Sequence, residues 1–268
     1  RSLTMETQSH IGPGRRWWLY AFMGLALAYL TIPSLIVLTM SFTDSTFLEF
    51  PPREWSLRWY RAYLESTEWR DATWISLKVA MLTVLIATPL GTVAAYVLRV
   101  SEVPCKTLIG ALLVAPMLVP HILVAVGLFF ALSPLGLSNT LVGLALAHAM
   151  LALPFVFILV SAGLKDHDML LEFAARSLGA SRSRTFFAVT LPQIRYSVIF
   201  GGIIAFITSL DEVIVAMFLA TGPLSTLTRR MFLSLRDAID PTIAAISSLL
   251  ILVSILVVIV YQVLGEGK

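Results

Sequence analysis

The sequence predicts an all-α integral membrane protein with six transmembrane helices. Hydrophobic residues make up 58% of the 268 positions, whereas charged residues make up only 13%. An ordinary soluble domain carries about 25% charged residues, and a soluble chain this apolar would expose large patches and aggregate. The apolar residues also gather in runs long enough to cross a bilayer, which takes about 20 residues per helix. The lipid bilayer is therefore the solvent that fits this chain.

Six apolar runs are the predicted spans, and they are uncharged except for Lys78 at the start of the second and Asp211 and Glu212 in the fifth. The runs lie near residues 17–41, 78–98, 107–132, 140–163, 196–220 and 241–264. The first run exceeds the roughly 7–15 residues of a signal-peptide core, so we expect a retained span rather than a cleaved leader. The turn-forming cluster at 133–139 separates the third span from the fourth.

Two prolines in the third span, Pro116 and Pro120, stand one helical turn apart. Proline removes a backbone hydrogen bond and kinks a helix, so the pair predicts a bent third span. The alternative is that transmembrane helices are simply richer in proline and glycine than soluble ones. Both interpretations stay open at this stage.

The segment 43–77, between the first two spans, is amphipathic and aromatic. It carries Trp55, Trp59, Tyr60, Tyr63, Trp69 and Trp74. Tryptophan and tyrosine favour the membrane interface, where the ring is half buried and its polar tip stays wet. We expect a loop with one or two helices lying near the membrane surface.

Lys and Arg placement favours an N-terminus on the inner side. With six spans, 11 Lys and Arg residues then fall on the inner side and 8 on the outer side. The pair Arg15–Arg16, next to the first span, adds to this bias. The opposite orientation is disfavoured but not excluded by charge alone.

Several functional classes find no support in the sequence. The net charge is only +3, and the basic residues are spread between apolar runs without a nucleic-acid-binding motif. Cys105 is the only cysteine, so neither an intrachain disulfide nor a cysteine-based zinc site is possible. No H-x-x-x-H or H-E-x-x-H pattern occurs, and we expect no metal site.

The polar segment 165–195 predicts two short helices on the inner face. Asp166 or Asp168 can cap the first helix, and Gly179 suits its C-terminus. An apolar stripe at helical spacing follows the cap: Leu170, Leu171, Ala174, Ala175 and Leu178. The pair Leu191–Pro192 is expected to end the second helix. A surface of this kind fits the groove of a soluble partner.

This segment resembles the cytoplasmic coupling loop of ABC importer permeases. The family pattern is E-A-A, a later Gly and then a Leu-Pro pair. Six positions match it: Ala174, Ala175, Gly179, Ala180, Leu191 and Pro192. Phe173 occupies the place of the motif glutamate, and Glu172 comes one residue early. A shift of one residue turns a helical side chain by about 100°, so either Glu172 reaches the partner from a rotated position or that contact is missing.

Leu57–Tyr60 and Ser76–Ala80 resemble the outer loop and the second-span entry of these permeases. In the fifth span, Ser209–Val213 followed by Thr221–Pro223 resembles most the spermidine/putrescine branch of the family. The resemblance implies one transmembrane permease domain over 1–268, of the type I importer fold, with 165–195 as its coupling loop. It also implies a bacterial inner membrane location with both termini cytoplasmic.

The resemblance further implies four kinds of partner. They are the lipid bilayer, a second homologous permease, two cytoplasmic ATP-binding subunits and an extracytoplasmic solute-binding protein. ATP and Mg²⁺ would then belong to the ATP-binding subunits, and this chain would be a transporter subunit rather than an enzyme, with no cofactor of its own. The sequence contains no G-x-x-x-x-G-K-[ST] phosphate-binding loop, which agrees with this division of labour.

Two groups of candidate functional residues follow. The expected ATPase-coupling residues are Glu172, Phe173, Ala174, Ala175, Gly179, Ala180 and Pro192. The expected substrate-pathway residues in the fifth span are Thr208, Ser209, Asp211 and Glu212. A carboxylate in hydrocarbon costs at least a few kcal/mol, so it should face a cavity or a partner. Neighbouring helical residues point about 100° apart, so we expect Asp211 and Glu212 not to line the pathway equally.

The two carboxylates can be interpreted in two ways. Either they form a wall that attracts a cationic solute, or they pair with Arg229 or Arg230 at the outer interface. His121 and His148 also fall within spans, where each is a substrate or proton ligand or, more simply, bonds a neighbouring helix.

The predicted function is a permease subunit that forms half of the pathway for a small, cationic, polyamine-like solute. Within the same family, the solute could instead be another small amine, an amino acid, an opine-like compound or a metal complex. An ion-coupled secondary transporter using Asp211 and His148 is the alternative, although no inverted repeat stands out. An intramembrane enzyme lacks a paired nucleophile and base.

Overall fold

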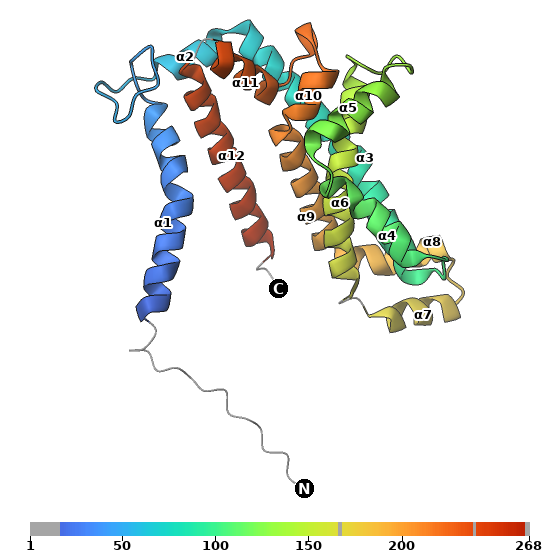
Figure 1. Cartoon of the computed structure of the whole chain (residues 1–268). Coiled ribbons are helices and arrows are strands. Elements are labelled where there is room, and N and C mark those ends of the chain that lie inside the picture. The colour runs from blue at the N-terminus through green and yellow to red at the C-terminus, as the bar shows by residue number, and fades with distance from the viewer. Residues whose placement is uncertain (1–16, 166–167, 238–239, 266–268) are drawn as a thin grey trace. The chain divides into compact units, whose positions relative to one another are not determined.

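The computed structural model describes residues 17–165, 168–237 and 240–265, and these residues are almost entirely helical (Figure 1). The elements in chain order are α1 (Trp17–Met40), α2 (Arg58–Glu65), α3 (Thr67–Val100), α4 (Lys106–Val114), the 3₁₀-helix η2 (Ala115–Met117), α5 (His121–Leu132), α6 (Leu141–Lys165), α7 (Met169–Ser177), α8 (Arg182–Thr185), the π-helix η3 (Phe186–Thr190), α9 (Leu191–Asp211), α10 (Ile214–Leu219), the 3₁₀-helix η4 (Gly222–Leu224), α11 (Leu227–Asp237) and α12 (Thr242–Gly265). The predicted all-α membrane fold is confirmed.

Four helical segments are long and apolar enough to cross a membrane. They are Trp17–Met40, Thr67–Val100, Leu141–Lys165 and Arg182–Asp211. A fifth candidate is the bent pair formed by Lys106–Met117 and His121–Leu132. In α12, the stretch Thr242–Leu256 is apolar but shorter than a span. Six spans therefore remain a prediction.

The second span begins earlier than predicted, at Thr67 rather than near residue 78. Ser66 caps α3 because its side chain accepts a hydrogen bond from the Trp69 N–H at 3.4 Å. Glu68 in the first turn favours the helix N-terminus through its charge. The surface segment before the span consequently holds one helix, α2, while Trp69 and Trp74 belong to α3.

The prediction that Leu191–Pro192 ends a helix is wrong. Pro192 lies in the first turn of α9, and α8, η3 and α9 follow one another without a break. The Leu191 N–H bonds the Phe186 carbonyl, five residues back. Such a π-turn re-pairs the backbone around Pro192, which has no N–H to donate.

The chain divides into two compact units, and the single-domain expectation stays a prediction. One unit comprises the described residues up to Arg61 together with Asp240–Ile251. Within it, the Tyr60 hydroxyl lies 2.7 Å from the Ser41 hydroxyl and 2.7 Å from the Ser248 hydroxyl. This chain of hydrogen bonds ties the end of α1 to α2 and α12. No residue of α1 is buried.

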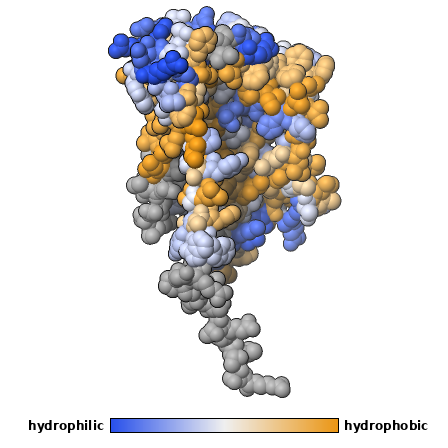
Figure 2. All heavy atoms as spheres, turned by 60° about the vertical axis from the view of Figure 1, so that its left-hand side comes forward, coloured by the Kyte–Doolittle hydropathy of each residue, from blue (hydrophilic) through white to orange (hydrophobic). Residues whose placement is uncertain are grey.

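The other unit contains every element from α3 to α11, and its centre is the trio α3, α6 and α9, which run side by side (Figure 1). Small residues allow this close packing: a Cβ added at Gly163 would lie 2.7 Å from the Ser197 Cβ on α9. Apolar side chains cover much of the visible surface of the molecule (Figure 2). Lipid or other apolar partners are the surroundings that such a surface needs.

Candidate functional site

The third span is sharply broken between Pro116 and Pro120. The helical segments on either side, Lys106–Met117 and His121–Leu132, meet at 102°. Pro120 itself precedes α5 in an extended conformation, with ψ of 128°. The predicted bend is therefore confirmed, and it places His121 at the first position of α5.

The fifth span is broken as well. We expected it to continue to residue 220, but α9 ends at Asp211 and the chain resumes as α10 at Ile214. Glu212 is extended in the break, and its Oε1 accepts a hydrogen bond from the Val215 N–H at 2.8 Å. Its backbone carbonyl accepts another from the Thr228 hydroxyl at 3.1 Å. Glu212 thus ends α9 and satisfies a backbone N–H in the first turn of α10, which hydropathy alone does not reveal.

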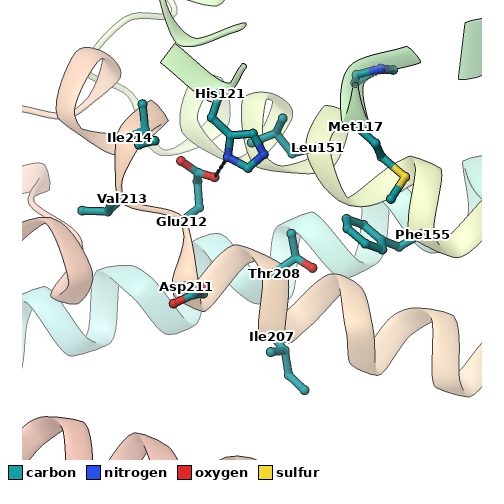
Figure 3. Close-up of a pocket in the computed structure, with 11 residues that line it drawn as sticks. Met117, His121, Leu151, Phe155, Ile207, Thr208, Asp211, Glu212, Val213 and Ile214 are labelled. Carbon is teal, nitrogen blue, oxygen red and sulfur yellow. Dashed lines mark ion pairs between the residues drawn. The ribbon is translucent and has the colours of Figure 1, made fainter. Parts of the chain in front are cut away.

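The two breaks meet at an ion-pair contact. Oε2 of Glu212 lies 3.3 Å from Nδ1 of His121, and Figure 3 shows the two side chains pointing toward one another. The Glu212 side chain is only 5% exposed, whereas that of His121 is 47% exposed. The two partners therefore differ in exposure: the Glu212 carboxylate is buried, whereas the His121 side chain still reaches solvent.

A pocket of about 460 Å³ opens beside this pair (Figure 3). Its lining residues come from α6, both sides of each break and the end of α9: Pro116, Met117, His121, Leu151, Phe155, Ile207, Thr208, Asp211, Glu212, Val213 and Ile214. The exposed Asp211 and the buried Glu212 line it together. The helix ends between them, and their exposure differs, so the two carboxylates line the pocket unequally.

Ser209 does not line this pocket. It is buried, and its hydroxyl lies 2.9 Å from Nδ1 of His148 and 3.3 Å from the Thr83 hydroxyl. The three polar side chains link α9, α6 and α3 in the middle of the helix trio. His148 thus bonds a neighbouring helix, the simpler of the two interpretations, with the Ser209 hydroxyl as a partner.

The coupling-loop segment folds as the short helix α7 and the start of the continuous helix formed by α8, η3 and α9, joined at Gly179. Asp168 caps α7 by accepting a hydrogen bond from the Leu170 N–H at 2.9 Å; Asp166, the alternative cap, lies outside the described residues. At the other end, the Ala180 N–H bonds the Ala175 carbonyl at 3.1 Å. This pattern is the Schellman ending, which requires a left-handed residue, and Gly179 supplies it with φ of +89°.

Glu172 points inward in this segment, and Phe173 points outward. Glu172 is 4% exposed, and it accepts hydrogen bonds from the Thr190 hydroxyl at 2.5 Å and the Tyr96 hydroxyl at 3.2 Å. Phe173 is 57% exposed. Glu172 therefore fastens α7 to α3 and η3, and its carboxylate faces the chain's own interior.

The remaining coupling residues lie at or near the surface. Ala174, Gly179 and Pro192 are exposed, whereas Ala175 and Ala180 are half-buried. A hollow of about 330 Å³ lies between α7 and the following helices, lined by Ala175, Leu178, Gly179, Ala180, Arg184, Thr185, Ala188 and Val189. Of the predicted coupling residues, Ala175, Gly179 and Ala180 line this hollow, whereas Glu172, Phe173, Ala174 and Pro192 do not.

Comparison with known proteins shows to which family this architecture belongs. Residues 87–267 match the family model described as the inner membrane component of binding-protein-dependent transport systems. The chain belongs to this permease family. It is therefore a membrane permease subunit of an ABC importer, a multi-pass inner-membrane protein and not an enzyme. This identity argues against the ion-coupled and intramembrane-enzyme alternatives.

The permease is similar to two curated proteins over most of its length. It is 29% identical to the putrescine transport system permease protein PotI of Escherichia coli K12, over 87% of this chain and 85% of that one. It is 27% identical to the spermidine/putrescine transport system permease protein PotC of the same strain, over 92% and 93% of the two chains. The resemblance to the polyamine branch is thus confirmed.

Solved structures show the same fold at low sequence identity. A bacterial ABC transporter involved in the import of the acidic polysaccharide alginate aligns with a TM-score of 0.70 and 15% identity, over 96% of the permease and 98% of that chain. A bacterial alginate ABC transporter in complex with a periplasmic protein bound to alginate pentasaccharide aligns with a TM-score of 0.72 and 17% identity, over 94% and 95%. The type I importer permease fold is thereby established.

Arg229 and Arg230 of the permease have partners other than Asp211 and Glu212. Arg230 pairs with Glu68 and lies 5.1 Å from the centre of the Trp69 ring. Arg229 donates a hydrogen bond to the Ser225 hydroxyl at 3.1 Å. Within the described part of the chain, neither arginine forms an ion pair with either carboxylate of the pocket.

Sequence reasoning missed the contact of His121 with Glu212 and the role of Tyr96 and Thr190 in holding Glu172. The first had a detectable signal, because a histidine directly after Pro120 is placed at the first turn of a new helix. The second had none, because Tyr96 and Thr190 are distant from Glu172 in sequence. Among the described residues, no group of three His, Cys, Asp or Glu side chains could hold a metal ion.

Proposed function

We propose that the permease forms half of the translocation pathway for a small cationic solute of the polyamine class. A second homologous permease completes the pathway, a solute-binding protein delivers the solute from outside, and two cytoplasmic ATP-binding subunits supply the energy from ATP and Mg²⁺. The names of PotI and PotC, which describe putrescine and spermidine transport, support this solute class. The alginate transporter complexed with its periplasmic protein supports the delivery step.

The observation that carries the proposal is the negative end of α9 in the pocket. The last carbonyls of a helix carry a partial negative charge, and the exposed Asp211 adds a full carboxylate at that point. Low-dielectric walls of leucine, isoleucine and phenylalanine surround it. Such a site attracts a cation more strongly than the same charge would in water. Thr208 adds a hydroxyl that can accept from an ammonium group.

The coupling loop is the proposed docking surface for an ATP-binding subunit. Phe173 and Leu178 are 57% and 90% exposed, so the surface offered to a partner is largely apolar. Because Glu172 is buried in the chain, the missing motif glutamate is not replaced at that position. In this arrangement residues 165–195 lie in the cytoplasm, as do both termini of the chain.

Uptake of putrescine and spermidine by the complete importer tests the proposal. The importer, with its own partner subunits, is expressed in cells that lack other polyamine uptake, and radiolabelled uptake is measured. Asp211→Asn keeps the shape and removes the charge, so it should reduce uptake about tenfold or more, the expected loss for a charge-assisted contact. Asp237→Asn, at an exposed position beside Arg236, is the matched control.

Two results would refute the proposal. One is absence of polyamine uptake by the assembled wild-type importer. The other is normal polyamine uptake in the Asp211→Asn variant. Co-purification of the ATP-binding subunit with each variant separates a transport defect from a failure of assembly.

A further inference from the structure

The contact of His121 with Glu212 joins two helix interruptions that lie far apart in the sequence. His121 begins α5 directly after the 102° bend, and Glu212 occupies the break between α9 and α10. Both residues line the pocket that contains Asp211 (Figure 3). A change at this contact would therefore be felt at both interruptions at once.

The helices beyond the two interruptions form one packed pair. α5 packs against α10, and the turn after α5 fastens their far ends. There the Asn139 N–H bonds the Leu219 carbonyl at 2.8 Å, and the Asn139 side chain accepts from the Thr221 N–H at 2.9 Å. The pair is thus held at its far end by one backbone bond and one bond to the Asn139 side chain. Buried side chains of both helices pack against α3 and α6, and the contact of His121 with Glu212 ties the near end of α5 to the break that precedes α10.

The two partners of this contact differ in how easily they can leave it. Glu212 is fixed by the Val215 N–H and is almost fully buried, so it stays in place. The His121 side chain is 47% exposed and can turn into the pocket without emptying a packed space. Its departure would leave Oε2 of Glu212 without its imidazole partner, beside the pocket. A buried carboxylate that has lost a hydrogen-bond partner needs a new hydrogen-bond donor.

We propose that His121 is a displaceable latch on Glu212. In the empty pocket, Nδ1 of His121 holds Oε2 of Glu212. When the solute binds, one of its ammonium groups pairs with Asp211 and a second ammonium group takes the place of His121 on Glu212. The near end of α5 is then no longer tied to the break between α9 and α10, so the two can move apart. This inference rests on the proposed function. It adds that the site recognises two positive charges on the solute rather than one.

The latch makes transport depend on differential binding. A solute shifts a conformational equilibrium only as far as it binds one state better than the other. A diamine gains the Glu212 contact only in the unlatched state, whereas a monoamine held by Asp211 gains nothing from unlatching. Solutes with one charge would therefore occupy the pocket without opening the latch.

Variants at the two residues test the latch in the assembled importer, reconstituted in liposomes with its partner subunits. Two quantities are measured: ATP hydrolysis without solute, and the KM for putrescine uptake. His121→Ala removes the competitor for Glu212, so it should raise solute-free hydrolysis several-fold and lower the KM. Glu212→Gln removes both the latch and the second acceptor, so it should raise solute-free hydrolysis and raise the KM about tenfold or more.

Three further variants show whether the two residues act as a unit. His121→Asn places an amide nitrogen near the position of Nδ1 and should restore low solute-free hydrolysis. Adding His121→Ala to Glu212→Gln should have no further effect, because the contact is already absent. Glu102→Gln removes a carboxylate from the exposed turn between α3 and α4 and is the control for charge loss.

The outcomes separate the latch from a structural role and from the proposed function. Unchanged solute-free hydrolysis in a correctly assembled His121→Ala importer would overturn the latch, as would a raised KM in that variant. If the wild-type importer takes up neither putrescine nor spermidine, the proposed solute is wrong. The solute-free hydrolysis of the His121 and Glu212 variants would still decide whether the latch exists.

Discussion

The carboxylate of Glu172 accepts a hydrogen bond from the Thr190 hydroxyl at 2.5 Å, which joins the coupling helix α7 to the π-helix below the fifth span. The Tyr96 hydroxyl donates to the other oxygen at 3.2 Å and adds a link to α3. The only acidic residue of α7 is therefore part of the internal framework of the permease. A force applied to α7 by a partner reaches two spans through this one side chain.

Replacing Glu172 by alanine should loosen α7 without removing any surface that a partner contacts. Hydrogen bonds to a charged group contribute about 1.5–3 kcal/mol each, and their loss should speed amide exchange across α7. Phe173→Ala is the contrasting variant: it should leave amide exchange in α7 unchanged and weaken association with the ATP-binding subunit. Hydrogen-exchange mass spectrometry measures the amide exchange in α7, and co-purification measures association with the ATP-binding subunit. Equal exchange rates in wild type and Glu172→Ala would refute the internal role.

Gly179 should tolerate substitution according to backbone conformation. Its φ of +89° lies in the left-handed region, and a Cβ there would meet no atom of this chain within 4 Å. Asn visits this region more readily than Ala, and β-branched residues are disfavoured most. Thermal stability should therefore fall in the order Gly, Asn, Ala, Val. Gly179→Trp should additionally uncouple ATP hydrolysis from transport, because it fills the surface proposed for docking.

Gly163 should not tolerate even a methyl group. A Cβ there would lie 2.1 Å from the Ser197 hydroxyl oxygen and 2.7 Å from its Cβ. Gly163→Ala should therefore destabilise the packing of α6 against α9 by about 1–3 kcal/mol. Ser197→Gly removes both clashing atoms, so the double variant should recover most of the loss. A melting temperature in detergent that is no higher for the double variant would contradict this contact.

Asn139 should stabilise the far end of the α5–α10 pair in two separable ways. Its φ is +56°, and its side chain accepts from the Thr221 N–H at 2.9 Å. Asn139→Gly keeps the conformation and loses the hydrogen bond, at a cost of about 0.5–1.5 kcal/mol. Asn139→Ala loses both and should cost roughly 1–2 kcal/mol more. Thermal unfolding of the two variants in detergent distinguishes the contributions.

The orientation of the chain is tested by topology reporters. One reporter is fused after Lys165, at the end of α6, and another after Arg229, in α11. With the N-terminus inside, the first should report the cytoplasmic side and the second the outer side. The reverse result would show that the weak charge bias of the sequence was misleading.

Local sequence signals predicted the features that depend on neighbouring residues. The proline pair predicted the 102° bend, and the Ser–Asn cluster at 133–139 predicted the turn between α5 and α6. Asp168 and Gly179 were recognised as cap positions because capping depends on residue type within one turn. The apolar runs located the spans to within a few residues in most cases.

Features that depend on distant contacts escaped prediction. The apolar run from Val213 to Ala220 looked like a continuation of the fifth span, because hydropathy does not register that Glu212 ends α9 and bonds the first turn of a new helix. That break also places Asp211 and Glu212 in the same pocket, which no local pattern predicted. The inward orientation of Glu172 depends on Thr190 and Tyr96, which no local pattern connects to it.

The π-helix at Phe186–Thr190 has a consequence for how the permease can vary over evolutionary time. A π-turn holds one more residue than an α-turn, and each helical residue turns the chain by about 100°. Deleting one residue here would restore a regular helix and leave α8, with α7 attached, facing nearly the same way, because the π-turn and the α-turn each close about one revolution. A deletion in α9 itself has no such turn to absorb it and would rotate the coupling helix by about 100° away from its partner.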